Sequence, residues 1–372
     1  MIKHPINSEL RLRQIAENRG PSGLSEHASR NLGSVGVMHS KGCELCQLGA
    51  KMVLFVTGLC YRSCFYCPLS EHRKGKDAVY ANERLVQCDA DLIAEARSMD
   101  ALGTGITGGE PLLALARVQH YTKLLKSEFG PQHHIHLYSS LAPSRHALRV
   151  LAYAGLDEIR IHPPIEEWDN FASSQYCEAL KYAKTLGLEA GVEIPAIKPV
   201  PAILNVLKEI RGFLNLNELE FSETNYGAMT VAGFVPFEYS YAASGSRQIA
   251  EEIANNEVPT YFCSSASKDS VQLRERFKRK ARRSARPFDE VTQDGTLVFG
   301  VVHSVPSFDF LTSIPKDDYA IVNGELHTSW QQALRLAKKH SALAEAVSVV
   351  ETHPDGTVVE VTPLNCCLKP KT

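Results

Sequence analysis

Three cysteines with a chemically meaningful spacing stand in one short segment of the chain. The run TGLCYRSCFYCP separates Cys60, Cys64 and Cys67 by three and then two residues. Thiolates are the usual protein ligands of iron–sulfur clusters. Because no fourth cysteine belongs to the run, a [4Fe-4S] cluster held here would keep one iron open to another molecule. The spacing therefore predicts redox chemistry at an accessible iron.

Two further cysteines upstream leave alternatives open. Cys43 and Cys46, together with Cys64 and Cys67, also fit the spacing of a four-thiolate zinc site, which would make this a non-catalytic zinc-ribbon binding module. That interpretation leaves Cys60 without a role. A third interpretation makes Cys43 and Cys46 the core of an accessory site for a second metal or iron–sulfur cluster. The remaining thiols available to it are Cys263, Cys366 and Cys367.

Composition sets wide limits on the kind of protein. The chain has 372 residues, of which 44% are hydrophobic, enough for one large core and a small second domain. Its net charge of -2 provides no overall attraction to nucleic acid or membrane. Ten cysteines without a secretory leader predict a reducing, cytoplasmic location, and apolar runs of strand length predict no membrane segment.

Strand-like and helix-like segments alternate from Lys51 onward, which predicts a parallel sheet covered by helices. The expected strands are Lys51–Thr57, Gly103–Thr107, His133–Tyr138, Asp157–His162, Leu188–Ile194 and Glu218–Ser222. The expected helices are Asp89–Leu102, Leu112–Phe129, Ser144–Tyr153, Ser173–Leu186 and Pro201–Arg211. Six strands with five intervening helices predict an α/β fold whose sheet curves into a partial barrel.

Polar side chains share one face of three of these strands. Alternation along a strand separates its apolar residues from its polar ones. A closed barrel normally fills its interior with branched apolar side chains, so a polar interior favours an open barrel that holds a ligand. The candidate catalytic residues on this face are His134, His136, Tyr138, His162 and Glu220.

A second motif, Gly108-Gly109-Glu110-Pro111, follows the second expected strand. Adjacent glycines allow a close approach of the main chain to a ligand. Glu110 adds an acceptor for an ammonium group, and a proline at the first helical turn starts the next helix. The motif indicates a ligand site when it stands one strand–helix unit after the three cysteines.

With both motifs in place, the chain resembles the radical S-adenosylmethionine (SAM) superfamily over residues 50–225. The cysteines match its cluster motif, Tyr66 is the aromatic residue before the third cysteine, and Gly108-Gly109-Glu110 matches its second-strand motif. The resemblance implies a partial (β/α)6 barrel, a [4Fe-4S] cluster and SAM bound at the open iron. It also implies that one electron cleaves SAM to give a 5′-deoxyadenosyl radical for hydrogen abstraction.

The same resemblance assigns further residues to SAM. Ser139 or Ser140 would hold the ribose, Arg160 would meet the carboxylate, and Glu193 falls near the adenine or ribose. Residues 49–77 are most similar to an uncharacterised group related to pyruvate formate-lyase activating enzymes. That similarity allows an alternative activity, an activase that installs a glycyl radical on a partner enzyme. A reductant such as ferredoxin or flavodoxin is implied as well.

The basic segment Arg274–Arg286, RERFKRKARRSAR, suggests a macromolecular substrate, RNA or protein, because such charge density can bind phosphates or an acidic surface. After it, Asp294-Gly295 and Asp355-Gly356 each separate β-rich runs, as in hairpins. The predicted domains are an extension (residues 1–48), a radical SAM core (49–225), a connecting helical segment (226–286) and a small α+β domain (287–372).

Overall fold

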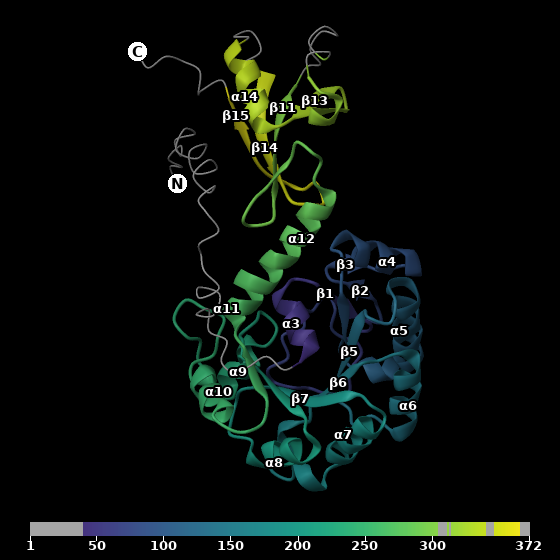
Figure 1. Cartoon of the computed structure of the whole chain (residues 1–372). Helices are drawn as coiled ribbons and strands as arrows, with labels where there is room; N and C mark the ends of the chain where they lie inside the picture. Colours follow the sequence, from purple (N-terminus) through teal and green to yellow (C-terminus); the bar gives the residue numbers. More distant parts are fainter. Residues whose placement is uncertain (1–39, 304–310, 312–313, 340–345, 365–372) are drawn as a thin grey trace. The chain divides into compact units, whose positions relative to one another are not determined.

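The computed structural model describes residues 40–303, 311, 314–339 and 346–364 (Figure 1). The chain divides into two compact units, with the change at Arg274. The larger unit comprises the described residues up to Leu273, and the smaller one comprises those from Arg274 onward. Each unit has its own sheet and its own hydrophobic core.

The larger unit is built on a nine-stranded sheet in the order β3-β2-β1-β4-β5-β6-β7-β8-β9. All neighbouring pairs from β1 to β9 in this order are parallel, as the alternation of strands and helices predicts. The parallel strands are β1 (Lys51–Phe55), β4 (Gly103–Thr107), β5 (His134–Ser139), β6 (Glu158–Ile161), β7 (Glu189–Pro195), β8 (Phe213–Asn217) and β9 (Thr260–Cys263). A short antiparallel pair, β2 (Tyr80–Ala81) and β3 (Arg84–Leu85), extends the β1 edge.

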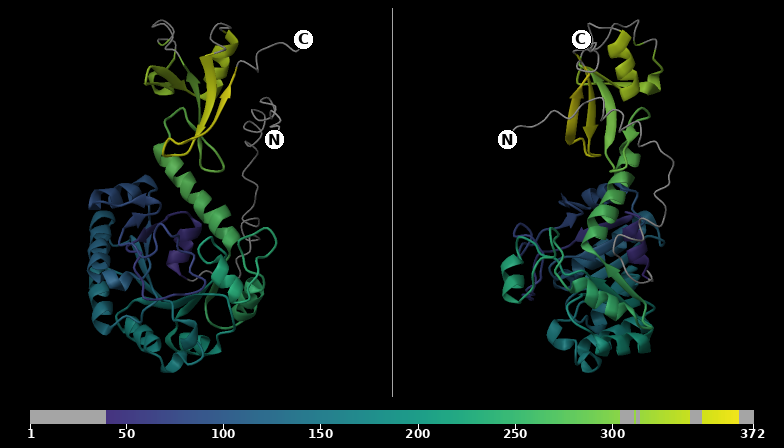
Figure 2. Two further views of the ribbon diagram at one scale, coloured as in Figure 1. Left: turned by 180° about the vertical axis from the view of Figure 1, so that it is seen from behind. Right: turned by 90° about the vertical axis from the view of Figure 1, so that its left-hand side faces the viewer.

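Helices cover the outer face of this curved sheet, as Figures 1 and 2 show. They are α4 (Asp89–Ser98), α5 (Leu115–Phe129), α6 (Arg145–Ala154), α7 (Gln175–Thr185) and α8 (Pro201–Ile210). Local sequence explains where α6 and α7 begin. The Ser144 and Ser174 hydroxyls accept hydrogen bonds from the amides of Ala147 and Cys177, respectively. In the described parts of the chain, no helix has the length and apolar composition needed to cross a membrane.

The two faces of the sheet differ in chemistry. Ile135 and Leu137 of β5 and Ile159 of β6 are fully buried in the core between sheet and helices. The intervening residues of these strands, such as His136 and Arg160, point to the concave side. The larger unit is therefore an α/β partial barrel with a polar interior.

The last two parallel strands differ from the predicted ones. The prediction of a strand at Glu218–Ser222 is wrong, because β8 ends at Asn217. Helix α8 stops at a residue in the left-handed conformation, Arg211 (φ 52°), and Gly212 then leads directly into the strand. Residues 218–222 continue past the end of the sheet, and β9 is a further parallel strand that the sequence analysis missed.

A short helix, α3 (Lys41–Gln47), lies on the concave side of the sheet, where its contacts are with β1, β4 and β5 (Figure 1). Its side chains reach several strands, since the Ser40 hydroxyl donates to Glu158 of β6 and the Gln47 amide donates to Tyr261 of β9. Helix α3 therefore occupies part of the polar interior.

The remaining elements of the larger unit join or follow the last strands. The single-turn elements are η1 (Pro111–Ala114), η2 (Ile165–Glu167) and η3 (Phe171–Ser173). Between β8 and β9 the chain forms α9 (Tyr226–Val231) and α10 (Ser246–Ala254). After β9 come α11 (Ser265–Ser267) and a π-helical turn, η4 (Lys268–Leu273).

The smaller unit begins with the basic helix α12 (Arg274–Ser284) and continues into an antiparallel sheet ordered β12-β13-β11-β14-β15. Its strands are β10 (Glu290–Val291), β11 (Leu297–Val302), β12 (Tyr319–Val322), β13 (Glu325–Thr328), β14 (Val347–Thr352) and β15 (Val358–Pro363), and its other helices are η5 (Lys316–Asp318) and α14 (Trp330–Lys339). Helix α14 packs against β11 and β14. This is the small α+β architecture expected from the sequence.

Candidate active site

A cavity of about 770 Å³ opens at the carboxyl ends of the parallel strands. Parallel sheets usually bind ligands at this edge, in loops that follow the strands. The lining comes mainly from the loops after β1, β4 and β8, from the ends of β5, β6 and β7, and from η4. Among the predicted site residues it includes Cys60, Cys64, Cys67, Tyr66, Gly108, Gly109, Tyr138, Ser140, His162 and Glu220.

The three cysteines occupy one loop after β1 and carry no disulfide. Cys60 is exposed, whereas Cys64 and Cys67 are half-buried. The amide of Cys67 donates to the carbonyl of Cys64 over 3.1 Å, which forms a tight turn. Burial raises the pKa of the Cys64 thiol, and the neighbouring Cys67 and Cys60 add to the rise. A positively charged ligand on these sulfurs would offset that cost of ionisation.

No group of three His, Cys, Asp or Glu side chains is placed to hold a single metal ion, within the residues that the structure describes. The cavity lining contains Cys64 and Cys67 but not Cys43 or Cys46, which argues against one zinc site shared by all four. The segment that would be the zinc-ribbon connector is strand β1, in the interior of the sheet. An inorganic cluster separates its thiolates further than one ion does, so the cysteine loop is compatible with a cluster.

The Gly-Gly pair lies directly against the cysteine loop. The amides of Gly109 and Glu110 donate to the carbonyls of Thr57 and Leu59, both over 2.7 Å. A Cβ atom at Gly109 would stand 2.4 Å from the Leu59 carbonyl oxygen, and one at Gly108 would stand 2.5 Å from that of Thr57. Only glycine permits this contact. The pair therefore holds the start of the cysteine loop while its main chain lines the cavity.

From the sequence, Glu110 is expected to accept a hydrogen bond from the ammonium group of a ligand. In the structure its partners are groups of the protein itself. Its carboxylate is fully buried and does not appear in the cavity lining. It accepts from the amides of Leu112, Ser140 and Leu141 and from the hydroxyls of Ser139 and Ser140, at 2.6–3.0 Å. Glu110 thus fixes the loop after β5, and Ser140 in turn reaches the cavity.

Tyr66, His162 and Tyr138 form a connected group in the cavity wall. The Tyr66 hydroxyl lies 2.8 Å from His162 Nε2, and Tyr138 Oη lies 2.6 Å from His162 Nδ1. The Glu193 carbonyl oxygen, 2.8 Å from Nδ1, can only accept. Nδ1 therefore carries the ring proton, and Nε2 accepts from Tyr66. Burial lowers the pKa of His162, which keeps the ring neutral.

Four other predicted residues lie deeper in the barrel, outside the cavity lining: His134, His136, Arg160 and Glu193. Arg160 Nε contacts Glu158 Oε1 at 2.5 Å, and its Nη1 donates to Glu193 Oε2 at 2.7 Å. Its Nη2 donates to the Ser40 hydroxyl at 2.7 Å. The structure thus places Arg160 in a buried ion network beneath helix α3, where it has protein carboxylates as partners.

The charge on Glu193 is stabilised by this network. Burial alone would raise its pKa, but Arg160 and a hydrogen bond from Asn217 lower the pKa of Glu193 to about 2. Asn217 donates over 3.0 Å to Glu193 Oε1 and also lines the cavity. It therefore connects the buried network to the open end of the barrel.

Five charged residues on the cavity wall were not predicted from the sequence: Arg62, Arg73, Lys74, Glu218 and Lys268. Lys268 Nζ lies 2.5 Å from Glu220 Oε1, and the pKa of Lys268 is raised because Glu220 and Cys263 outweigh the effect of burial. Arg62, within the cysteine loop, donates to the Tyr176 hydroxyl over 2.6 Å. Arg62 stands between Cys60 and Cys64 in the sequence, and this position indicates a site residue. Lys268 belongs to no recognisable motif.

Comparison with known proteins identifies the chain. No family model matches it. It is 40% identical over 274 residues to a protein of Methanocaldococcus jannaschii named "Putative glycyl-radical enzyme activating enzyme MJ0021", and the match covers 70% of this chain and 73% of that protein. The chain is a radical SAM enzyme.

Solved structures similar to this radical SAM enzyme include SuiB of Streptococcus suis bound to its precursor peptide SuiA, with a TM-score of 0.40 and 10% identity. That match covers 71% of this chain and 56% of the SuiB chain. Methylornithine synthase (PylB) matches with a TM-score of 0.39 and 13% identity, over 62% of this chain and 72% of the other.

Proposed function

We propose that this radical SAM enzyme installs a glycyl radical on a partner protein. The proposal is carried by one observation, the 40% identity to a relative named as a glycyl-radical enzyme activating enzyme. The alternative in which the enzyme modifies RNA makes different demands on the surface around the cavity. The composition of the segment beside the cysteine loop supports the first.

The cofactors fit the residues present. Cys60, Cys64 and Cys67 are three unpaired thiols on one loop that lines one cavity, and that lining contains no fourth cysteine. They would hold a [4Fe-4S] cluster with one open iron. Gly108, Gly109 and Ser140 offer main-chain and hydroxyl groups for SAM in the same cavity. Together these cofactors supply a 5′-deoxyadenosyl radical, which takes one hydrogen atom from the substrate.

The chain's own residues prepare the cavity for that reaction. Tyr66 is held by His162, so the loop that carries the cysteines is tied to the end of β6. Glu220 and Lys268, paired at the cavity wall, present polar groups to a bound substrate. A glycine residue has no side chain, so its main chain could enter a cavity that already contains SAM. The electron would come from a ferredoxin or flavodoxin.

The segment beside the cysteine loop favours a protein substrate. It exposes six large apolar or aromatic side chains: Tyr226, Val231, Val235, Phe237, Tyr239 and Tyr241. It is attached to the cysteine loop, since Asn225 donates to the Tyr66 carbonyl over 3.1 Å and Phe234 stacks on Phe65. Exposed apolar groups gathered in one segment are typical of protein-binding surfaces.

The same segment is poorly suited to RNA. Between Glu223 and Gly245 there is no lysine or arginine, and the charged residues there are Glu223 and Glu238. Nucleic-acid binding needs cations close to the phosphates. The basic residues that suggested RNA belong to α12, in the smaller unit, where Lys278 is paired with Glu275. Arg282 and Arg283 of that helix are exposed, so RNA is retained as the second arm of the test.

The test separates protein from RNA substrates. Reduced enzyme and SAM are incubated with the protein fraction or the RNA fraction of the source cells, and 5′-deoxyadenosine is measured. We expect stimulation by the protein fraction that protease abolishes and ribonuclease does not, together with a glycyl-radical signal in electron paramagnetic resonance (EPR). Stimulation that only ribonuclease abolishes, and that is lost when Arg279, Arg282 and Arg283 become Glu, would contradict the proposal.

Two surface variants sharpen the test. Tyr239→Ser with Tyr241→Ser should lower the protein-stimulated rate at least about thirtyfold, because losing an aromatic anchor from an interface costs more than about 1 kcal/mol for each of the two residues. The control is Tyr153→Ser, since the exposure of Tyr153 lies between those of Tyr239 and Tyr241 but Tyr153 belongs to α6. An equal loss in both proteins would show that the segment has no special role.

A further inference from the structure

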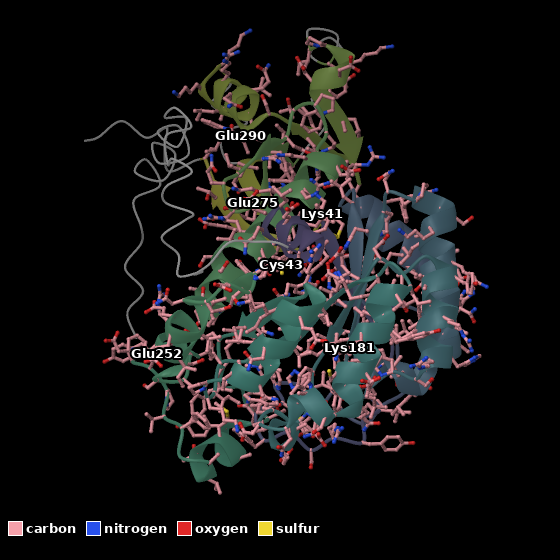
Figure 3. All side chains as sticks on the ribbon, turned by 60° about the horizontal axis from the view of Figure 1, so that its bottom comes forward. Lys41, Cys43, Lys181, Glu252, Glu275 and Glu290 are labelled. Carbon is pink, nitrogen blue, oxygen red and sulfur yellow. The ribbon has the colours of Figure 1, made fainter. Side chains whose placement is uncertain are left out.

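A second group of cysteine thiols lies inside the barrel, away from the cysteine loop. Cys43 and Cys46 belong to α3, and Cys263 is the last residue of β9 (Figure 3 labels Cys43). Cys43 is buried, Cys46 and Cys263 are half-buried, and none of the three is in a disulfide. The fold has therefore brought two distant parts of the chain to one place.

A single side chain connects two of these thiols. Cys46 Sγ lies 2.6 Å from Gln272 Oε1, and Gln272 Nε2 donates to Cys263 Sγ over 3.3 Å. Because the oxygen and nitrogen of one amide group are about 2 Å apart, the two sulfurs are within about 8 Å of each other. Rotation of the Gln272 side chain would leave the space between them free.

Cys43 belongs to the same group. It precedes Cys46 by three positions on α3, and residues with this spacing share one helix face. Cys43 and Cys46 therefore lie on one side of α3, and Cys46 is the member of the pair that Gln272 joins to Cys263.

One buried ring nitrogen beside the thiols lacks a hydrogen-bond partner, within the described part of the chain. His136 is 5% exposed and its Nδ1 has no hydrogen-bond partner. A Cβ atom at Gly42 would stand 2.5 Å from that nitrogen, so the ring faces α3 next to Cys43.

We infer that Cys43, Cys46 and Cys263 bind a second thiolate-ligated metal centre, with His136 as the adjacent nitrogen ligand. Thiolate and imidazole ligands select zinc or iron–sulfur clusters. No three of these side chains are placed for direct coordination of one ion among the described residues, so binding requires the thiols to turn toward the space that Gln272 bridges.

This centre is independent of the proposed function. It uses none of the residues that line the cavity. Of the thiols that the sequence left available it takes Cys263, while Cys366 and Cys367 lie outside the described residues, and it adds His136 to the site. Metal content can be measured without a substrate, so the inference stands or falls separately from the glycyl-radical proposal. Since the thiols must lose protons to bind, the metal should also be released as the pH falls.

The test begins with Cys64→Ala protein, purified without oxygen. This change removes a ligand of the cysteine-loop cluster, so any metal that remains reports on the second centre. We expect about one centre per chain, as iron with matching sulfide or as zinc, and the two analyses distinguish these forms. Cys64→Ala protein with neither iron nor zinc would overturn the inference.

Two further variants locate the metal. In the Cys64→Ala background, Cys46→Ala and Cys263→Ala should each lose the remaining metal completely. The matched control is Cys177→Ala, since Cys177 is also buried but lies on α7, outside this thiol group, and its metal should be unchanged. Circular dichroism confirms that each variant is folded. Metal retained in folded Cys46→Ala protein would contradict the assignment.

Discussion

The two ends of the barrel use similar residue types for different purposes. At the carboxyl end, cysteines, tyrosines and a histidine line a cavity, and the three cysteines there carry no disulfide. Deeper in the barrel, Glu158, Arg160, Glu193 and Ser40 are bonded to one another, and helix α3 covers them. A polar residue on the inner face of a strand is therefore not sufficient evidence of a ligand site.

The difference depends on how far along its strand each residue lies, which we call its level. Tyr138 and Ser140 stand at or just after the end of β5, whereas His134 and His136 stand in its first half. The same holds for His162, which follows β6, and Arg160, which lies within it. Only the later residues reach the cavity. Variants at the two levels should therefore have different effects, the first on chemistry and the second on stability.

The largest effect is expected at the cysteine loop. Cys64→Ala leaves two thiolates for the cluster, which should be lost together with all SAM cleavage. The measurement is 5′-deoxyadenosine formed by reduced protein, with iron content determined on the same sample. Cleavage at the wild-type rate would show that Cys64 is not a ligand.

Arg160→Met tests the deeper level. It leaves two buried carboxylates without their cation, so we expect a loss of about 3–5 kcal/mol in the free energy of unfolding, from urea denaturation. The control is Lys184→Met, which breaks the more exposed pair of Lys184 with Glu189 and should cost no more than about 1 kcal/mol. Unchanged stability in Arg160→Met would mean that the network is not structural.

The pH dependence of stability offers a separate check on this network. The pKa of Glu193 is about 2 in the folded protein, below its ordinary value of 4.5. Its contribution is therefore fully present above pH 4.5 and is lost as the pH falls toward 2. Wild-type protein should lose stability more steeply in this window than Glu193→Gln protein, as followed by urea unfolding at each pH. Identical slopes would contradict the lowered pKa.

Tyr66→Phe should have the smallest effect. It removes the contacts of the hydroxyl with His162 and with the Cys64 thiol and keeps the aromatic ring, so stability should fall by about 0.5–1.5 kcal/mol. The cluster content should be unchanged, because the cysteines remain. Complete loss of iron in Tyr66→Phe protein would mean that the hydroxyl, and not only the ring, is needed to form the loop.

The carboxyl end of the barrel was largely predictable from sequence. Consecutive strand–helix units bring their loops to one edge of a parallel sheet, so Cys60 and Gly109 had to be close. The alternation in β5 also identified Ile135 and Leu137 as the outward face. These predictions depend on local periodicity and on the regular order of the strands.

The rest of the site depends on contacts that no local pattern indicates. Nothing in the sequence of α3 shows that it enters the barrel and bonds to Glu158 and Arg160. The strand predicted at Glu218–Ser222 was misplaced because the polar–apolar alternation continues beyond Asn217, where the strand ends. Lys268 reaches the cavity from a π-helical turn, an irregularity that periodicity cannot predict.

The most direct test of the account is EPR of the reduced protein with and without SAM, in a Cys46→Ala background that removes the inferred second centre. We expect the signal of one [4Fe-4S] cluster, broadened further when SAM carries ¹⁷O in its carboxylate, because SAM binds the open iron next to Cys60, Cys64 and Cys67. A colourless protein that contains stoichiometric zinc, or a cluster signal that SAM leaves unchanged, would contradict the central claim.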